Sequence, residues 1–447
     1  MQPGRTDPGT RTRGPIPPGG PTRRGVLAGL AGLGGLAAAA ALSGCARGSS
    51  TSSVPGAANL YNDNATWSDG YEKAGAVLKR ICGFDLRPLS NASTTSYQEV
   101  VQTSVQTSRA ADVVKWASGY PLFSLARSGG LTELGPVWED AVRKGWVSPQ
   151  LRRGVTFQGG IYGIPLYQSS YVFFYAKPVF AKYGLHEPAT WGEFTHNAEV
   201  LKRNGVTPFL ATQNGVWPAF EWFEELVSKL DPDFYTRLVN GRAKYTDDTV
   251  REAMTIWRDF YAKGWMTAPD FDGANGPAQM KAGKLAMFLH GSWESAAIAA
   301  AGLRPDVDYG AFVMPTVHAG TKQSVITESG VFAVPKRAAN HPGGLAVVSH
   351  WLDPRVQRVW SDFLQDSSAN PTVPAGNPVI EAVQQDIARN RRTLLTRYNE
   401  ASPPNLIQGN ILDLGNFMIH PTAIRSTLES MQKRADQEWD IWRKGGS

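Results

Sequence analysis

Short β-prone runs alternate with helically spaced apolar residues in the first part of the folded sequence, which begins near Asn59. The predicted strands are 59–62, 84–89 and 112–116. The predicted helices start at Asp69, at Ser96 and at Pro121. A strand–helix–strand–helix–strand order is typical of a parallel sheet with helices on its faces.

Two of these helix starts carry polar pairs at capping-box spacing. Asp69 precedes Glu72 by three positions, and Ser96 precedes Glu99 in the same way. Gly83 follows the first of these helices and is predicted to end it.

The same alternation continues through the rest of the chain, without a fixed-period repeat or a heptad run. Further strands are predicted at 171–175, 209–212, 286–289 and 331–334. Further helices are predicted at 190–204, 219–230, 246–263, 342–363 and 422–442. The fold class is therefore α/β.

The segment before the folded sequence reads as an export signal. Arg23 and Arg24 precede an uncharged Ala/Gly/Leu run at 26–42, and twin arginines at that place indicate export of an already folded protein. The run ends in Leu-Ser-Gly-Cys, which resembles the bacterial lipobox, so we expect removal of residues 1–44 and lipidation of Cys45. An uncleaved membrane anchor is the alternative, although the run is short for a span. The Ser/Gly/Ala-rich stretch 45–58 is predicted to be a flexible tether.

Charge and cysteine content narrow the function classes. The chain has a formal net charge of +6, but residues 1–44 hold five arginines and one acid, so the remainder is close to neutral. Nothing in that balance calls for a nucleic acid partner. With Cys45 lipidated, Cys82 has no partner for an intrachain disulfide, and we expect it to be a buried structural thiol.

Catalytic patterns are weak. The seven histidines form no H-E-x-x-H or Cys-His cluster, and no G-x-S-x-G or phosphate-binding loop occurs, so we expect no metal, no cofactor and no enzymatic activity. Glu221, Glu224 and Glu225 could be imagined as paired glycosidase acids, but their helical spacing favours a solvated or cleft-rim face.

Four stretches, in order and spacing, together resemble the family-one extracellular solute-binding proteins of ABC importers, the group that includes maltose-binding protein. They are ADVVKWA at 111–117 with SGGLTEL at 128–134, GIYGIP at 160–165, PATWGEF at 188–194, and MKAGKLAM at 280–287 with GSW at 291–293. The resemblance covers about 59–447.

Two departures from the family pattern affect what can be expected. The family often has Tyr-Asn-Lys-Asp after the first hinge strand, whereas this chain has Tyr-Ala-Lys-Pro at 175–178, in which Pro178 still suits a helix start. A hinge-side carboxylate that often grips sugar hydroxyls is replaced by Gln168, Ser169 or Ser170. Maltose itself is therefore in doubt as the ligand.

The resemblance implies a two-lobed, periplasmic-binding-protein-like fold, with a mostly parallel, helix-flanked sheet in each lobe and a ligand cleft between the lobes. The expected lobes are 59–166 with 321–370, and 167–320 with 371–447. It further implies a lipid-anchored, monomeric receptor on the extracytoplasmic face of the cell membrane, which binds a carbohydrate, an oligosaccharide or glycoside, and delivers it to ABC permease subunits.

The candidate ligand-binding residues flank predicted strand ends and crossings, where ligands of open α/β sheets bind. They are Asn64, Trp67, Trp116, Tyr167, Gln168, Gln213, Asn214, Trp217, Trp293 and Glu328. Indole and phenol rings can cover the apolar face of a pyranose, while amides and carboxylates pair with its hydroxyls.

Each of these assignments has a structural alternative, since loop amides often cap the backbone and indoles often pack in cores. Core or interlobe packing is the expectation for the tryptophans within helical patterns, namely Trp191, Trp257, Trp351, Trp360, Trp439 and Trp442. Two other functions also stay open: an exported glycoside-active enzyme, and a binder of a non-sugar solute such as a polyamine or oxyanion.

Overall fold

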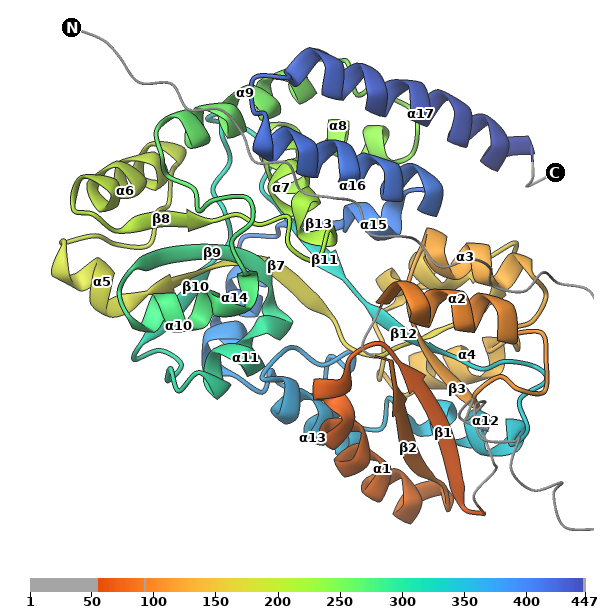
Figure 1. The fold of residues 1–447 in the computed structure, drawn as a ribbon. Coiled ribbons are helices and arrows are strands. Elements are labelled where there is room, and N and C mark those ends of the chain that lie inside the picture. The colour runs from red at the N-terminus through yellow and green to blue at the C-terminus, as the bar shows by residue number, and fades with distance from the viewer. Residues whose placement is uncertain (1–54, 92–93, 445–447) are drawn as a thin grey trace, which may run out of the picture. The chain divides into compact units, whose positions relative to one another are not determined.

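A computed structural model describes residues 55–91 and 94–444 (Figure 1). The predicted signal peptide, Cys45 and most of the predicted tether lie outside these residues. Among the described helices, none is long and apolar enough to cross a membrane.

The first sheet has the strand order β2-β1-β3-β12-β6. Its strands are β1 (Ala57–Asn62), β2 (Asp85–Ser90), β3 (Val113–Ala117), β6 (Ile164–Pro165) and β12 (Gly330–Ala333). The three strands predicted nearest the N-terminus pair in parallel, as expected. A separate hairpin joins β4 (Thr156–Phe157) to β5 (Gly160–Ile161).

The second sheet has the order β13-β11-β7-β9-β8, with β10 also paired to β7. Its strands are β7 (Ser169–Ala176), β8 (Thr207–Leu210), β9 (Leu285–Gly291), β10 (Tyr309–Phe312), β11 (Ser324–Glu328) and β13 (Thr393–Thr396). β7 is buried along its whole length, which fits its central position and its run of apolar residues.

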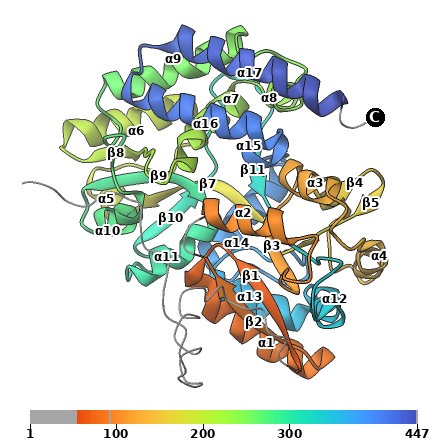
Figure 2. The ribbon, with the colours of Figure 1, turned by 45° about the vertical axis from the view of Figure 1, so that its right-hand side comes forward.

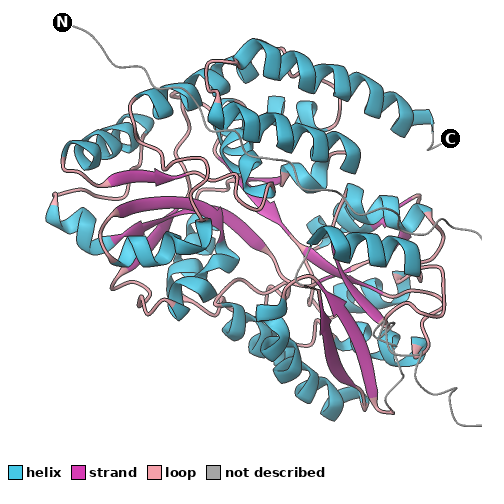
Figure 3. Cartoon of the chain, in the orientation of Figure 1, coloured by secondary structure: helices cyan, strands magenta, loops and turns pink. Residues whose placement is uncertain are grey.

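The α/β class with two helix-flanked sheets is confirmed (Figure 3), but both sheets are mixed. β12 runs antiparallel to β3, and β7 runs antiparallel to β9 and β11. The physical reason is connectivity. β6 leads directly into β7, and β11 leads directly into β12, so the chain leaves one sheet on β6 or β11 and enters the other sheet on β7 or β12, the strands that run antiparallel to their neighbours.

Helices flank the first sheet and connect its strands. They are α1 (Ser68–Cys82), α2 (Thr94–Ser104), α3 (Tyr120–Arg127), α4 (Gly135–Arg143), α12 (His341–His350) and α13 (Pro354–Leu364). A short turn of 3-10 helix, η1 (Ala65–Trp67), precedes α1.

Helices of the second sheet are more numerous. They are α5 (Lys177–Lys182), α6 (Trp191–Arg203), α7 (Glu221–Leu230), α8 (Pro232–Val239), α9 (Asp248–Ala262), α10 (Gly276–Lys281), α11 (Ser295–Ala300), α14 (Pro378–Arg389), α15 (Tyr398–Ala401), α16 (Pro404–Ile419) and α17 (Ile424–Lys444). Short 3-10 turns, η3 (Trp217–Phe220) and η5 (Ser292–Glu294), precede α7 and α11. α16 and α17 lie side by side (Figures 1 and 2), joined by hydrogen bonds from Arg434 to Asn410 and Asp413.

Three local predictions need correction. No side chain caps α1, which begins one residue before Asp69 as a continuation of η1. Ser96 lies inside α2 rather than at its start. The helix predicted at 342–363 is two helices, because Pro354 cannot continue α12 and Asp353 caps α13 instead.

Two further local predictions are confirmed, at Gly83 and Pro178, and the predicted burial of Cys82 is wrong. Gly83 ends α1 in the left-handed conformation, with φ of 82°. Pro178 lies in the first turn of α5. Cys82 is half-buried rather than buried, since its sulfur lies near the end of α1, 3.9 Å from the carbonyl oxygen of Phe84; partial burial raises the pKa of its thiol.

Two separate clusters of buried apolar side chains form within the described residues. The first core lies on the first sheet, and the second core lies on the second sheet. The chain passes between the two sheets three times: at 166–168, at Ser329, and in the segment between α13 and α14. Side chains at these crossings form the candidate site.

Candidate functional site

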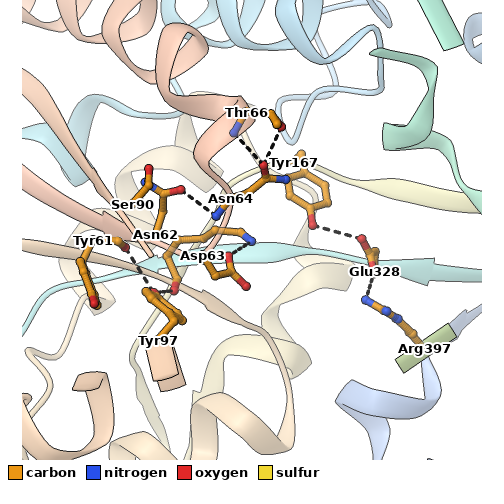
Figure 4. Close-up of polar contacts among 11 residues, drawn as sticks. Tyr61, Asn62, Asp63, Asn64, Thr66, Ser90, Tyr97, Tyr167, Glu328 and Arg397 are labelled. Carbon is orange, nitrogen blue, oxygen red and sulfur yellow. Dashed lines mark hydrogen bonds and ion pairs between the residues drawn. The ribbon is translucent and has the colours of Figure 1, made fainter. Parts of the chain in front are cut away.

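Glu328, at the end of β11, is buried and fully paired (Figure 4). Its carboxylate accepts hydrogen bonds from the hydroxyls of Tyr167, at 3.1 Å, and of Tyr171, at 3.3 Å, and forms an ion pair with Arg397. Burial, with the charge of Glu328 beside it, holds the pKa of Tyr167 well above its usual value. Burial likewise raises the pKa of Tyr171, so both phenols remain protonated donors.

Arg397 connects this crossing to aromatic side chains of the second sheet. Its guanidinium carbon lies 5.4 Å from the ring of Tyr171, 5.2 Å from that of Trp217 and 5.0 Å from that of Phe220. These are cation–π distances. The buried Nε of Arg397 has no hydrogen-bond partner among the described residues.

Beyond Arg397, three rings form what we call the aromatic cluster: Trp217, His290 and Trp293. The rings of Trp217 and His290 are stacked, with centroids 5.4 Å apart and planes 10° apart. Trp293 lies 4.5 Å from His290 and 6.1 Å from Trp217. Although Trp293 follows a strand of the second sheet, it packs against the first core, whereas Trp217 packs against the second.

Two further buried acids join segments from different parts of the chain. Asp366 accepts hydrogen bonds from Ser169 and from Ser292, the latter at 2.6 Å. Burial raises the pKa of Asp366 to about 7. Glu400 accepts a hydrogen bond of 2.8 Å from Ser118, and burial together with the nearby charge of Glu328 raises the pKa of Glu400 to about 8.

Half of the candidate ligand-binding residues lie along one continuous path of contacts. Trp67 meets Tyr167 edge to face at 5.7 Å, and Tyr167 bonds to Glu328. Glu328 pairs with Arg397, which lies over Trp217, and Trp217 contacts Trp293.

The remaining candidates do not join this path. Asn64 caps η1, accepting hydrogen bonds from the backbone and hydroxyl of Thr66 (Figure 4), which is the capping role that loop amides often have. Trp116 is buried against Tyr97, with its indole nitrogen unpaired in the described structure. Gln168 and Gln213 are half-buried, and Asn214 is exposed.

Of the two alternatives expected for Glu221, Glu224 and Glu225, a solvated or a cleft-rim face, the solvated face is wrong. Every residue of α7 is buried, because the helix is enclosed on all sides. Glu221 bonds to His290, Glu224 accepts the backbone N–H of Tyr398 at 2.7 Å, and Glu225 pairs with Lys229 at 3.2 Å.

Sequence reasoning missed Arg397, His290, Asp366 and Glu400. His290 was within reach, because it directly follows the strand predicted at 286–289 and directly precedes the family-like GSW motif at 291–293. The other three lie outside the motifs, in segments whose pairing depends on contacts distant in sequence. In the described part of the chain, no group of three or more His, Cys, Asp or Glu side chains is arranged to hold a metal ion.

The tryptophans expected to have packing roles have them. Trp257, Trp351, Trp360 and Trp439 are buried, and Trp191 packs on Phe194 and Phe260. Trp442 contacts Tyr120 and Arg127 of α3, so it joins a helix of the second sheet to one of the first.

The described residues thus combine two mixed, helix-flanked sheets, three crossings between them, and an aromatic, charged region beside those crossings. The profile of the bacterial extracellular solute-binding protein family matches residues 88–358. The chain belongs to this family.

Individual proteins agree with the family assignment. An uncharacterised ABC transporter extracellular-binding protein of Pyrococcus horikoshii is 28% identical over 328 residues, which cover 69% of this chain and 71% of that protein. The solute receptor AcbH, described as preferring β-D-galactopyranose, superposes with a TM-score of 0.77 at 19% identity, covering 86% of this chain and 100% of the other. The GacH receptor of Streptomyces glaucescens, solved unliganded and with acarbose, gives a TM-score of 0.67 at 18% identity, covering 88% and 99%.

The molecule is therefore an extracellular solute-binding component of an ABC transporter, and it is not an enzyme. The expectation drawn from the four sequence motifs is confirmed at this level.

Proposed function

We propose that this protein is a lipid-anchored receptor that binds a carbohydrate, an oligosaccharide or glycoside, and delivers it as a monomer to ABC permease subunits. The ligand would lie between two lobes, one built on each sheet, and would contact side chains that flank the crossings. Release would leave the carbohydrate chemically intact.

The observation that carries this proposal is the juxtaposition of indole faces with buried, oriented charges. Trp217 and Trp293 are only partly buried, so ring surface remains available beside the cluster. The Glu328–Arg397 pair lies next to Trp217. Apolar ring faces and a few fixed polar groups are what a pyranose needs.

The structural relatives described above support the carbohydrate class, since AcbH is described with β-D-galactopyranose and GacH with acarbose. A non-sugar solute is the rival within the same family. A polyamine site would need several free carboxylates, whereas Glu328 and Glu221 are already engaged by Arg397 and His290.

A thermal-shift screen tests the solute class. Purified protein is heated with mono- and oligosaccharides, with polyamines and with small oxyanions. A ligand at 100 times its Kd stabilises the folded protein by about 2.7 kcal/mol, which is readily detected. We expect stabilisation by at least one sugar, with no release of reducing ends. Stabilisation by polyamines or oxyanions alone would overturn the carbohydrate proposal.

The proposed anchor is tested separately. A twin-arginine signal at 1–44 followed by the lipobox-like Leu-Ser-Gly-Cys supports lipidation of Cys45. We expect Cys45→Ala to move the protein from the membrane fraction to the soluble fraction of cells. Unchanged membrane association would contradict the proposal, and Cys82→Ala is the matched control.

The proposed lobes are 59–166 with 321–370, and 167–320 with 371–447, with one adjustment. β11 pairs with β7 and β13 of the second sheet, so we place its residues, Ser324–Glu328, in the second lobe. The second crossing then falls at Ser329, between β11 and β12. Closure of the lobes would be a hinge motion driven by differential affinity for ligand.

A further inference from the structure

His290 occupies an unusual position at the end of β9. It lies three residues before Trp293, its ring stacks on Trp217, and it contacts Trp293 from another direction. It is therefore the one titratable ring in the aromatic cluster, and a change in its charge would act on both indoles.

Carboxylates face both nitrogens of the His290 ring. Nδ1 lies 2.6 Å from Oε1 of Glu221, which is buried at the start of α7. Nε2 lies 3.8 Å from Oε2 of Glu294, which is largely buried in η5. Two acceptors on opposite sides of an imidazole favour the form in which both nitrogens carry protons.

One positive group opposes this arrangement. Arg397 lies on the Trp217 side and disfavours a second cation nearby, and burial also disfavours the charged ring. The two carboxylates have the larger combined effect. Burial lowers the pKa of His290, but the charges of Glu221 and Glu294 raise it by more, so the pKa lies above its ordinary value.

A protonated imidazole has a physical effect on neighbouring indoles that a neutral one lacks. A cation near the face of a tryptophan is attracted by the negative charge of the π-system. His290 meets Trp217 at an interplanar angle of 10° and Trp293 at 60°. The same cation can therefore fix the orientation of both rings.

We propose that His290 is a positioning residue for solute binding: as an imidazolium held between Glu221 and Glu294, it orients Trp217 and Trp293, and solute affinity falls when it loses its proton. This inference rests on the proposed function in one respect, namely that the two indoles contact the solute. The charge state of His290 and its effect on the rings do not depend on it.

The sign of the pH dependence follows directly. Below the pKa of His290 the ring is charged and the indoles are held, and above it the attraction is lost, so affinity decreases as the pH rises. Asp366 and Glu400, with pKa values of about 7 and about 8, also titrate near neutral pH, and burial raises the pKa of Glu294 beside His290. A variant comparison is therefore needed to isolate His290.

The first experiment uses no ligand. Histidine ring carbons are labelled, and the His290 signal is assigned by its loss in His290→Gln and followed by NMR against pH, together with the near-ultraviolet circular dichroism of the tryptophans. We expect a midpoint above about 6.5, with a dichroism change at the same midpoint that the variant lacks. A midpoint at or below that value, or dichroism that ignores it, would overturn the inference.

The second experiment measures affinity by calorimetry for the best sugar found in the screen. Parent affinity should fall about three- to tenfold between pH 5.5 and pH 9, as expected for loss of a cation–π contact. His290→Gln should bind weakly and equally at both pH values, and His290→Arg, which keeps a planar cation, should exceed the parent at pH 9. If His290 had a purely structural role, His290→Gln would bind the sugar more weakly than the parent, but its affinity would still fall with rising pH as the parent's does.

The matched control is His350→Gln. His350 is also half-buried, but its Nδ1 bonds to the carbonyl oxygen of Ala346 within α12, away from the aromatic cluster. This variant should keep the parent's pH profile. If no sugar binds the parent protein, the proposed function fails, while the ligand-free titration still decides for or against a charged His290 that orients the indoles.

Discussion

Arg397 is the positive group beside three buried acids. Burial lowers the pKa of its guanidinium, but the ion pair with Glu328 and the proximity of Glu224 and Glu400 raise that pKa by more. Its side chain is only 14% exposed, so water cannot replace it as a partner. Removing one member of such a buried group leaves the others uncompensated.

We therefore expect Arg397→Met to destabilise the protein by about 3–5 kcal/mol. Urea unfolding followed by tryptophan fluorescence measures this effect. Arg143→Met is the control, since Arg143 is 69% exposed and its pair with Asp140 should contribute little. Equal unfolding midpoints for the two variants would show that the buried pair is not what stabilises the crossing.

A second prediction concerns Trp293, which packs against the first core from a loop of the second sheet. Trp293→Ala should weaken sugar binding at least about tenfold, because truncating a buried aromatic anchor typically costs more than 1.4 kcal/mol. Calorimetry gives the affinity directly. Trp146→Ala removes a comparable half-buried indole that packs against the first core just after α4, outside the aromatic cluster, and should bind as the parent does.

At this scale, the sequence shows which residue types flank the strands, but not what each side chain contacts. Trp217, Trp293, Tyr167 and Glu328 were singled out because they flank strands that hydrophobic runs predict, and in the structure they lie on one path of contacts. Asn64 lies outside that path, because an amide after a strand can equally cap the next turn. Arg397 could not be found, since Glu328, its ion-pair partner, lies 69 residues away in the sequence and no local pattern marks an ion pair of that kind.

At the scale of elements, the contact between α3 and α15 shows how closely the two sheets' helices approach. Gly119 precedes α3 with φ of 68° and ψ of −142°, a conformation that is essentially restricted to glycine. A Cβ atom at Gly119 would lie 2.0 Å from the carbonyl oxygen of Glu400. The neighbouring Ser118 donates its hydroxyl to the carboxylate of Glu400.

Gly119→Ala should therefore be more destabilising than an ordinary left-handed glycine substitution. The matched control is Gly83→Ala: Gly83 has φ of 82°, but a Cβ there would meet nothing within 4 Å. We expect about 1–2 kcal/mol for the control, from backbone conformation alone, and about 1–3 kcal/mol more for Gly119→Ala. Thermal or urea unfolding provides the comparison, and equal losses would mean that α15 moves aside without cost.

Element positions were largely predictable, because each core strand is a short apolar run and most helices have an amphipathic spacing. Element ends were less predictable. Asp69 and Glu72 have capping-box spacing, yet η1 already supplies the start of α1. The antiparallel entry of β7 and β12 was also missed, since strand direction depends on where the chain crosses between sheets.

On the scale of the whole molecule, separate cores are joined by three crossings and by a few side-chain contacts. Arg127 of α3 lies 3.9 Å from the ring centre of Trp442 in α17, and Tyr120 packs on the same indole. Asp366 lies in the third crossing and accepts hydrogen bonds from Ser169 of β7 and Ser292 of η5. A charge change at Asp366 therefore acts where the crossings meet.

The raised pKa of Asp366 makes the free energy of unfolding decrease as the pH rises. Burial raises this pKa from 3.8 to about 7, so the folded protein binds a proton between these values that the unfolded chain does not. That proton stabilises the folded state below about pH 4, and its contribution is lost as the pH rises through 7. A shift of this size corresponds to a loss on the order of 4 kcal/mol.

We expect Asp366→Asn to abolish this part of the pH dependence, because an amide stays neutral and can still bond to both serines. The variant should match the parent near pH 4 and exceed it in free energy of unfolding at pH 8, as measured by urea unfolding across that range. Asp362→Asn is the control: this exposed carboxylate, four residues away, pairs with Arg358 at 3.5 Å in solvent and should leave the parent's profile unchanged. If the parent is as stable as Asp366→Asn at pH 8, ionisation of Asp366 costs no stability. The serine hydroxyls at the crossings would then bond to a carboxylate rather than to a carboxylic acid.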